Sequence, residues 1–120
     1  METMDLAKQY FSSMRDKNIE QLKQLANSDV RVKSPLGELI GLDAFVKFQN
    51  GFFKMINSLT LNHVFVDGTT AAIFYTANTK PVAKSDMVEL LQFKNNQLIS
   101  TTVIYDGTPF AEYVKSIQQS

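Results

Sequence analysis

Two oxygen-bearing side chains, Tyr10 and Glu89, stand in apolar surroundings that would alter their chemistry. Tyr10 shares a predicted helical face with Leu6 and therefore points inward. Glu89 lies between Met87 and Leu91 on one face of a predicted strand, where a carboxyl group either sits at a pocket rim or is held neutral by the loss of water. We expect the two side chains to meet in a pocket and to donate hydrogen bonds jointly to a ligand oxygen. The alternatives are a core tyrosine and a solvent-facing glutamate.

The sequence lacks the residues and motifs that usually bind transition metals or cofactors. His63 is the single histidine and the chain has no cysteine, so a transition-metal site of the common kinds is not expected. A half-exposed strand histidine is the better interpretation of His63. The sequence also has no glycine-rich phosphate loop and no nucleophile elbow. We therefore predict neither a metal nor a cofactor.

Composition narrows the range of partners. The chain has 120 residues, which suits one domain spanning 1–120, and its 12 basic and 12 acidic residues give no formal net charge. This balance argues against binding to nucleic acid or to an anionic membrane. No apolar run approaches the roughly 18 residues that a membrane helix needs. The acidic N-terminus does not resemble a signal peptide, and the lack of cysteine agrees with a cytoplasmic location.

Apolar residues with helical spacing predict helices before and after a run of strands. The first runs from about Asp5 to Arg15, and Asn18 can cap a short second helix. A third, from about Leu42 to Asn57, has an apolar face of phenylalanines. Thr108-Pro109 is typical of the start of a last helix.

Alternating residues and turn signals predict the strands. The first begins at Asp29 and stops at Ser34-Pro35, because proline cannot donate to a sheet ladder, and Gly37–Gly41 is expected to be a turn. Asp67-Gly68 and Asn95-Asn96 are typical hairpin turns. The four later strands are predicted at Leu59–Val66, Thr70–Asn78, Lys84–Phe93 and Leu98–Tyr105. Helices followed by a bent antiparallel sheet indicate an α+β domain with the sheet wrapped around a helix.

Both faces of the later strands are apolar, which bears on assembly. In the strand that holds Glu89, the opposite face carries Val88 and Leu90. One face should cover the helices and any cavity. The other would be an exposed apolar patch on a monomer, so we predict a homodimer through the sheet.

The order of these landmarks resembles the nuclear transport factor 2-like superfamily, in its SnoaL-like and ketosteroid-isomerase-like branch. The resemblance spans about Leu6 to Val114. It implies a single cone-shaped domain, a curved mixed or antiparallel sheet around a mostly apolar pocket, and frequent dimerisation. The residues that carry it are Tyr10-Phe11, Asp29-Val30, Ser34-Pro35-Leu36-Gly37, Gly41, Asp67-Gly68, Ala71-Ala72, Glu89-Leu90-Leu91-Gln92-Phe93, Asn95-Asn96 and Tyr105-Asp106.

The same resemblance suggests catalytic roles and two departures from the family pattern. It places the oxyanion tyrosine of ketosteroid isomerases at Tyr10 and the protonated acid at Glu89. The base position falls on Ser34, whose hydroxyl cannot take a proton without a neighbouring base, so ketosteroid isomerase activity itself is not expected. The residue that supports the tyrosine falls on Gln49, which is the second departure. Asp106 is a candidate acid or base, although Asp-Gly-Thr-Pro also reads as a turn or helix cap.

The resulting functional prediction is a pocket for a small apolar molecule that carries a carbonyl or hydroxyl group. The protein would be an isomerase or cyclase with Tyr10 and Glu89 as oxyanion donors. The alternatives are a ligand-binding protein without catalysis and a dimeric scaffold. The expected pocket lining, from strand parity and the resemblance, comprises Val32, Ser34, Phe48, Phe52, Phe74, Thr76, Asn78, Met87, Val103 and Tyr105.

Overall fold

A computed structural model describes residues 1–118 and contains four helices and one sheet in that range. The predicted helices are present, and Asn18 caps the second by accepting a hydrogen bond from the Gln21 amide at 3.1 Å. The third helix ends two residues before the predicted Asn57, where the next strand begins. The helices are α1 (Thr3–Arg15), α2 (Ile19–Leu25), α3 (Leu42–Met55) and α4 (Thr108–Gln118).

The six strands form one mixed sheet in the order β2-β1-β6-β5-β4-β3. Only β1 and β6 run parallel; every other neighbouring pair is antiparallel. The parallel pair brings the segment between α2 and α3 back beside the last strand. The strands are β1 (Ala26–Ser34), β2 (Gly37–Ile40), β3 (Ile56–Asp67), β4 (Thr70–Thr79), β5 (Ser85–Lys94) and β6 (Gln97–Ile104).

The hairpin turns have the conformations that their residues favour. Gly68 has φ +62°, and Asn95 and Asn96 have φ +52° and +63°, the left-handed values that tight hairpins require. The prediction of a turn at Gly37–Gly41 is wrong in part. Residues 37–40 extend into the short edge strand β2, which pairs with β1 beyond Pro35, and Gly41 alone makes the turn into α3, with φ +102°.

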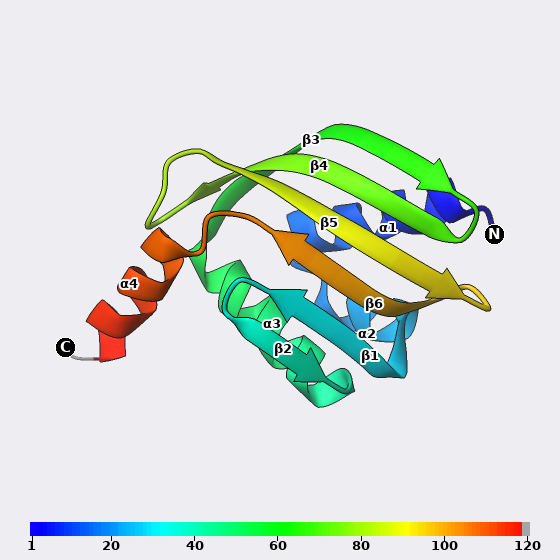
Figure 1. The fold of residues 1–120 in the computed structure, drawn as a ribbon, viewed down its shortest axis with the longest axis horizontal. Helices are drawn as coiled ribbons and strands as arrows, with labels where there is room; N and C mark the ends of the chain where they lie inside the picture. Colours follow the sequence, from blue (N-terminus) through cyan, green and yellow to red (C-terminus); the bar gives the residue numbers. More distant parts are fainter. Residues whose placement is uncertain (119–120) are drawn as a thin grey trace.

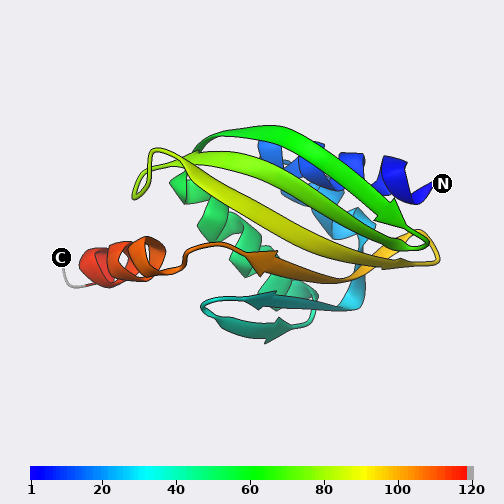
Figure 2. The ribbon, with the colours of Figure 1, turned by 45° about the horizontal axis from the view of Figure 1, so that its top comes forward.

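The sheet curves around the helices without closing, as Figures 1 and 2 show. Helices α1 and α3 lie on its concave side, and α4 extends from the end of β6 at one end of the molecule (Figure 1). Shifts of register interrupt β3 between Leu61 and His63 and the β5–β6 pair between Gln92 and Phe93. Such bulges increase strand twist and bend the sheet. The α+β class and the curved sheet are therefore confirmed.

The concave face and the convex face carry different residues. Ile73, Glu89 and Val103 lie opposite one another across β4, β5 and β6, and all three are buried on the concave face. Phe74, Val88 and Ile104 form the neighbouring row on the convex face, where Phe74 and Ile104 are exposed. No helix within residues 1–118 is long and apolar enough to cross a membrane.

Candidate functional site

Three hydroxyl groups converge on the carboxyl group of Glu89 in the middle of the concave face. Tyr10 from α1 donates to Oε1 at 2.6 Å, and Thr101 from β6 donates to the same oxygen at 2.8 Å. Tyr75 from β4 donates to Oε2 at 2.5 Å. Glu89 is only 2% exposed. Its two oxygens are thus held by three elements that are distant in sequence.

Burial and hydrogen bonding act on Glu89 in opposite directions. Loss of water raises the pKa of its carboxyl group, and the bonds from Tyr10, Tyr75 and Thr101 lower that pKa without cancelling the rise. Burial and the nearby Glu89 charge raise the pKa of the Tyr10 and Tyr75 hydroxyls well above 10.0. Both phenols therefore stay protonated, and Glu89, whose pKa is raised by burial, is the member of this network that is the candidate to gain or lose a proton.

Gln49 extends this network from α3 and keeps one polar atom free. Its Nε2 donates to the Tyr10 hydroxyl oxygen at 3.1 Å. Because the single proton of that hydroxyl goes to Glu89, the amide must present its nitrogen to Tyr10. Oε1 of Gln49 is then buried without a hydrogen-bond partner in the described part of the chain. A buried acceptor in this state is a place for a ligand donor or a water molecule.

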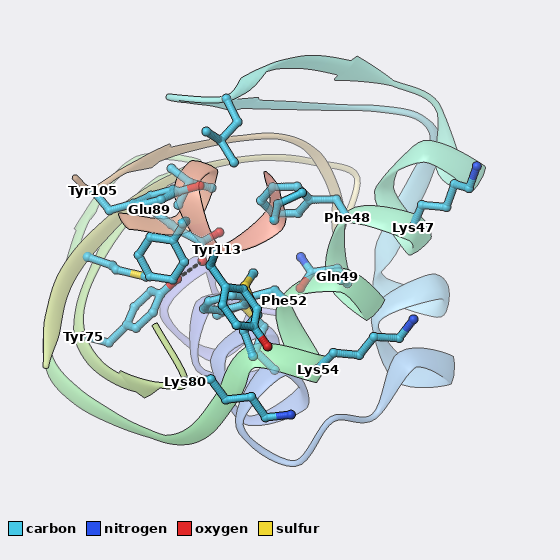
Figure 3. A pocket seen from close by; sticks show the side chains of 18 of the residues that line it. Lys47, Phe48, Gln49, Phe52, Lys54, Tyr75, Lys80, Glu89, Tyr105 and Tyr113 are labelled. Carbon is cyan, nitrogen blue, oxygen red and sulfur yellow. Dashed lines mark hydrogen bonds between the residues drawn. The ribbon is translucent and has the colours of Figure 1, made fainter. Parts of the chain in front are cut away.

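A cavity of about 630 Å³ opens beside the carboxyl group, within the usual size range of small-molecule sites. Figure 3 shows Glu89 and Tyr75 across this pocket from Gln49 and α3. Tyr10 is fully buried behind Glu89 and is not among the lining residues. The lining is mostly apolar and comprises Met14, Leu36, Lys47, Phe48, Gln49, Gly51, Phe52, Lys54, Met55, Tyr75, Lys80, Met87, Glu89, Val103, Tyr105, Phe110, Tyr113, Val114 and Ile117.

Five of the residues expected in the lining are found there: Phe48, Phe52, Met87, Val103 and Tyr105. The two phenylalanines project from α3, and the other three come from β5, β6 and the segment after β6. The Tyr105 ring packs edge-to-face on Phe110 of α4, with ring centroids 5.2 Å apart. This contact joins the last helix to the pocket wall.

The expected positions of Phe74, Thr76 and Asn78 are wrong. All three side chains lie on the convex face of β4, because Phe74 pairs with Val88 rather than with the concave-face residue Glu89. Thr76 donates a hydrogen bond to Asp86, and Asn78 accepts one from Asn57, in exposed positions. These three residues therefore belong to the outer surface of the sheet.

Three other predicted site residues also lie off the pocket. Val32 is buried in the core on the concave side of β1 and does not reach the cavity. Ser34, at the end of β1, accepts a hydrogen bond from the Leu36 amide and bonds with Tyr105. Asp106 is exposed and accepts a hydrogen bond from the Thr108 amide at 3.1 Å, so its carboxylate serves the start of α4 rather than the pocket.

Sequence reasoning missed Tyr75 and Thr101, the two other donors to Glu89. A signal for Tyr75 existed: it occupies the same strand parity as the small and apolar residues Ala71, Ile73 and Ala77. This signal is weak, because β4 also carries the apolar residues Ala72 and Phe74 on its opposite face. Thr101 carries no such signal, since a threonine in a strand is common on either face.

Comparison with known proteins agrees with the fold. The family model for the SnoaL-like domain matches residues 7–101. No curated protein matches this chain. A crystal structure of a protein from Kribbella flavida DSM 17836 is 23% identical, with a TM-score of 0.86 over 97% of this chain and 96% of that one.

Two further crystal structures carry functional names. One from the same organism, provisionally named a ketosteroid isomerase, is 21% identical, with a TM-score of 0.78 over 86% of this chain and 76% of that one. A provisionally named SnoaL-like polyketide cyclase from Jannaschia sp. CCS1 is 12% identical, with a TM-score of 0.79 over 91% and 88% of the two chains. At these identities the likeness is one of fold, and it confirms the resemblance seen in the sequence.

Proposed function

This chain belongs to the SnoaL-like domain family, and on that premise we propose that it binds an apolar small molecule bearing a carbonyl or hydroxyl group. We further propose that it is an enzyme of the isomerase or cyclase type, in which Glu89 transfers a proton. The observation that carries both statements is the Glu89 carboxyl group, buried yet lining a mostly apolar cavity. Such a pocket, with few polar groups, orients a ligand through its oxygen.

The three hydroxyl protons that are donated to Glu89 suggest how the site would catalyse proton transfer. When Glu89 is ionised, the hydroxyls of Tyr10, Tyr75 and Thr101 all donate to it, and the carboxylate is a base. If it takes a proton from a ligand carbon next to a carbonyl group, the carboxyl group no longer needs all three donors. Tyr75, which lines the cavity, can then turn its proton to the oxyanion forming on the ligand.

This arrangement differs from the expectation that Tyr10 and Glu89 both donate directly to the ligand. Tyr10 lies behind Glu89, so its role would be to position the carboxyl group and lower its pKa. Tyr75 takes the place next to the ligand. Oε1 of Gln49 would accept a hydrogen bond from a ligand hydroxyl, which favours ligands with both a carbonyl and a hydroxyl group.

A second candidate function is ligand binding without catalysis. The observation in its favour is that Glu89 is the one carboxyl group in the described lining, so no second carboxyl group is available to return the proton elsewhere. The scaffold alternative, in which the protein's own side chains fill the pocket, is disfavoured by the cavity of about 630 Å³.

Proton exchange separates the enzyme from the binder. We would dissolve 2-acetylnaphthalene with the protein in D₂O and follow the loss of its methyl proton signal by NMR. An enzyme of the proposed type accelerates this exchange, and the Glu89→Gln variant abolishes the acceleration. Tyr75→Phe should slow it roughly 100-fold or more, as loss of an oxyanion donor does elsewhere. Binding without any acceleration would leave the non-catalytic function.

The convex face of the sheet supports a homodimer as part of the same proposal. Phe65 and Ile104 on this face are 59% and 57% exposed. His63, Phe65 and Phe74 form an aromatic cluster there, with ring centroids 5.6 to 6.3 Å apart. An apolar surface of this kind on a small domain favours contact with a second copy.

A further inference from the structure

The cavity is lined by three lysines, Lys47, Lys54 and Lys80, and all three are exposed, which places them at its mouth. Lys47 and Lys54 are seven residues apart on α3, which is about two helical turns, so they project from the same side of the helix. Gly51 lies between them and also lines the opening. With no side chain at Gly51, this stretch of α3 leaves the entrance open between the two lysines.

Lys80 is fixed near the end of the same helix by the backbone. Its amide donates to the Met55 carbonyl at 2.9 Å, which ties the segment after β4 to the residue that follows Lys54. Figure 3 shows Lys54 and Lys80 at the same edge of the pocket, and Lys47 further along α3. The three lysines thus come from two segments that line the same cavity.

These lysines form no ion pair within the described chain. The ion pairs there involve Arg15, Lys23 and Arg31, and none of the three rim lysines takes part. The one acidic residue in the described lining is Glu89, at the inner end of the pocket. Because the whole chain has no formal net charge, this clustering of positive charge is local to the mouth.

We infer that the natural ligand of this pocket is an amphipathic acid, with an anionic carboxylate held at the lysine rim, an apolar body, and a carbonyl or hydroxyl oxygen at Tyr75 and Glu89. This inference rests on the proposed function, since it assumes that the oxygen-bearing end lies inside. A flexible lysine stem can cover the apolar body while its ammonium group meets the carboxylate in solvent. The rim would also attract the acid from solution.

The test uses a rigid probe with the two ends that the inference requires. 6-Acetyl-2-naphthoate has an acetyl group at one end and a carboxylate at the other, and its primary amide has the same shape without the charge. Dissociation constants of both compounds would be measured by fluorescence titration at low salt and in about 0.5 M NaCl. We expect the acid to bind roughly tenfold more tightly than the amide at low salt, from several exposed charge contacts, and to lose most of that preference at high salt.

Two triple variants locate the effect. Changing Lys47, Lys54 and Lys80 to glutamine should make the dissociation constants of the acid and the amide equal, because the charge that distinguishes the two compounds no longer has a partner at the rim. The matched control changes Lys8, Lys33 and Lys94 to glutamine; these lysines are exposed and lie outside the lining, so the net charge falls equally but the preference should persist. Circular dichroism would establish that both variants are folded.

The outcomes distinguish the two proposals. If the acid and the amide bind equally in the unchanged protein, or if the control variant loses the preference as fully as the rim variant, the inference about the rim is overturned while the pocket proposal stands. If neither compound binds, the proposed function itself fails, and the inference fails with it.

Discussion

The hydroxyl of Tyr10 donates to a carboxylate oxygen of Glu89 at 2.6 Å, across 79 positions of the sequence. This bond joins the first helix to the central strand of the sheet at the inner end of the cavity. Because Tyr10 is fully buried, the bond is protected from water and holds the carboxyl group in one orientation. Helix α1, on the concave side of the sheet, therefore takes part in shaping the site.

Replacing Tyr10 with phenylalanine should raise the pKa of Glu89. The hydrogen bond from Tyr10 lowers that pKa, whereas burial raises it. When the bond is lost, less remains to offset the effect of burial, and the pKa rises. We also expect the free energy of unfolding to fall by about 1–3 kcal/mol, the usual cost of leaving a buried polar group short of a partner. A carboxyl ¹³C NMR titration would measure the first effect and urea unfolding the second. Tyr113→Phe, in the same pocket but without a bond to Glu89 in the described contacts, should move neither.

Stability should depend on pH through Glu89, with a definite sign. Its folded-state pKa is raised above the usual 4.5, so between these two values the folded state holds a proton that the unfolded chain has lost. The free energy of unfolding therefore falls as pH rises from 4.5 to the folded-state pKa, and this contribution is constant above it.

The Glu89→Gln variant should lack this dependence. Urea unfolding at a series of pH values would show the free energy of unfolding of the variant rising relative to that of the unchanged protein across this window. A difference that stays flat with pH would mean that the carboxyl group titrates normally. The low-pH end supplies the internal control, because the carboxyl group is protonated in both states there.

Substitution by alanine at two glycines should change the stability of the protein in opposite directions. A Cβ at Gly107 would lie 2.9 Å from the Pro35 Cβ, and Pro35 is held in the tight turn between β1 and β2. Gly107→Ala should therefore destabilise the protein by about 1–3 kcal/mol, as overpacking does. At Gly51, within α3, a Cβ meets open space, so Gly51→Ala should stabilise the helix by roughly 0.5–1 kcal/mol. Thermal unfolding of both variants tests the pair, and a shift of the same sign in each would contradict it.

The proposed dimer predicts that a charge on the convex face produces monomers. Leu90 is 39% exposed in the single chain, and burying a glutamate there against a second copy would be costly. Light scattering at micromolar concentration should give a dimer mass for the unchanged protein and a monomer mass for Leu90→Glu. Leu39 on the edge strand β2 is equally exposed but lies on the other face, so Leu39→Glu should remain dimeric. A monomeric mass for the unchanged protein would refute the dimer.

Most helices and hairpins could be predicted from the sequence, because the residues within each of these elements are enough to indicate its conformation. Asp67-Gly68 and Asn95-Asn96 favour the backbone conformations of their hairpins, and the phenylalanine spacing of α3 suits one helical face. The edge strand β2 was missed since its four residues are all exposed and have no apolar alternation. Its pairing with β1 depends on the Pro35 turn, not on its own composition.

The site was only partly predictable because strand register decides which face a residue takes. Glu89 was placed correctly, between the buried residues Met87 and Leu91. In β4 both faces carry apolar residues, so alternation favours Tyr75 over Phe74 only weakly. The pairing of Tyr75 with Met87 settles that choice, and it is a long-range contact that no local pattern encodes.

A crystal structure of the protein with 2-acetylnaphthalene would test the central claim most directly. The claim is that the inner end of the cavity holds a ligand oxygen beside Tyr75 and Glu89. We predict the naphthalene rings in the pocket against Phe48 and Phe52, and the carbonyl oxygen within about 3.2 Å of the Tyr75 hydroxyl, the range of a hydrogen bond. A ligand bound with its carbonyl group at the lysine rim, or bound only outside the cavity, would contradict the proposal.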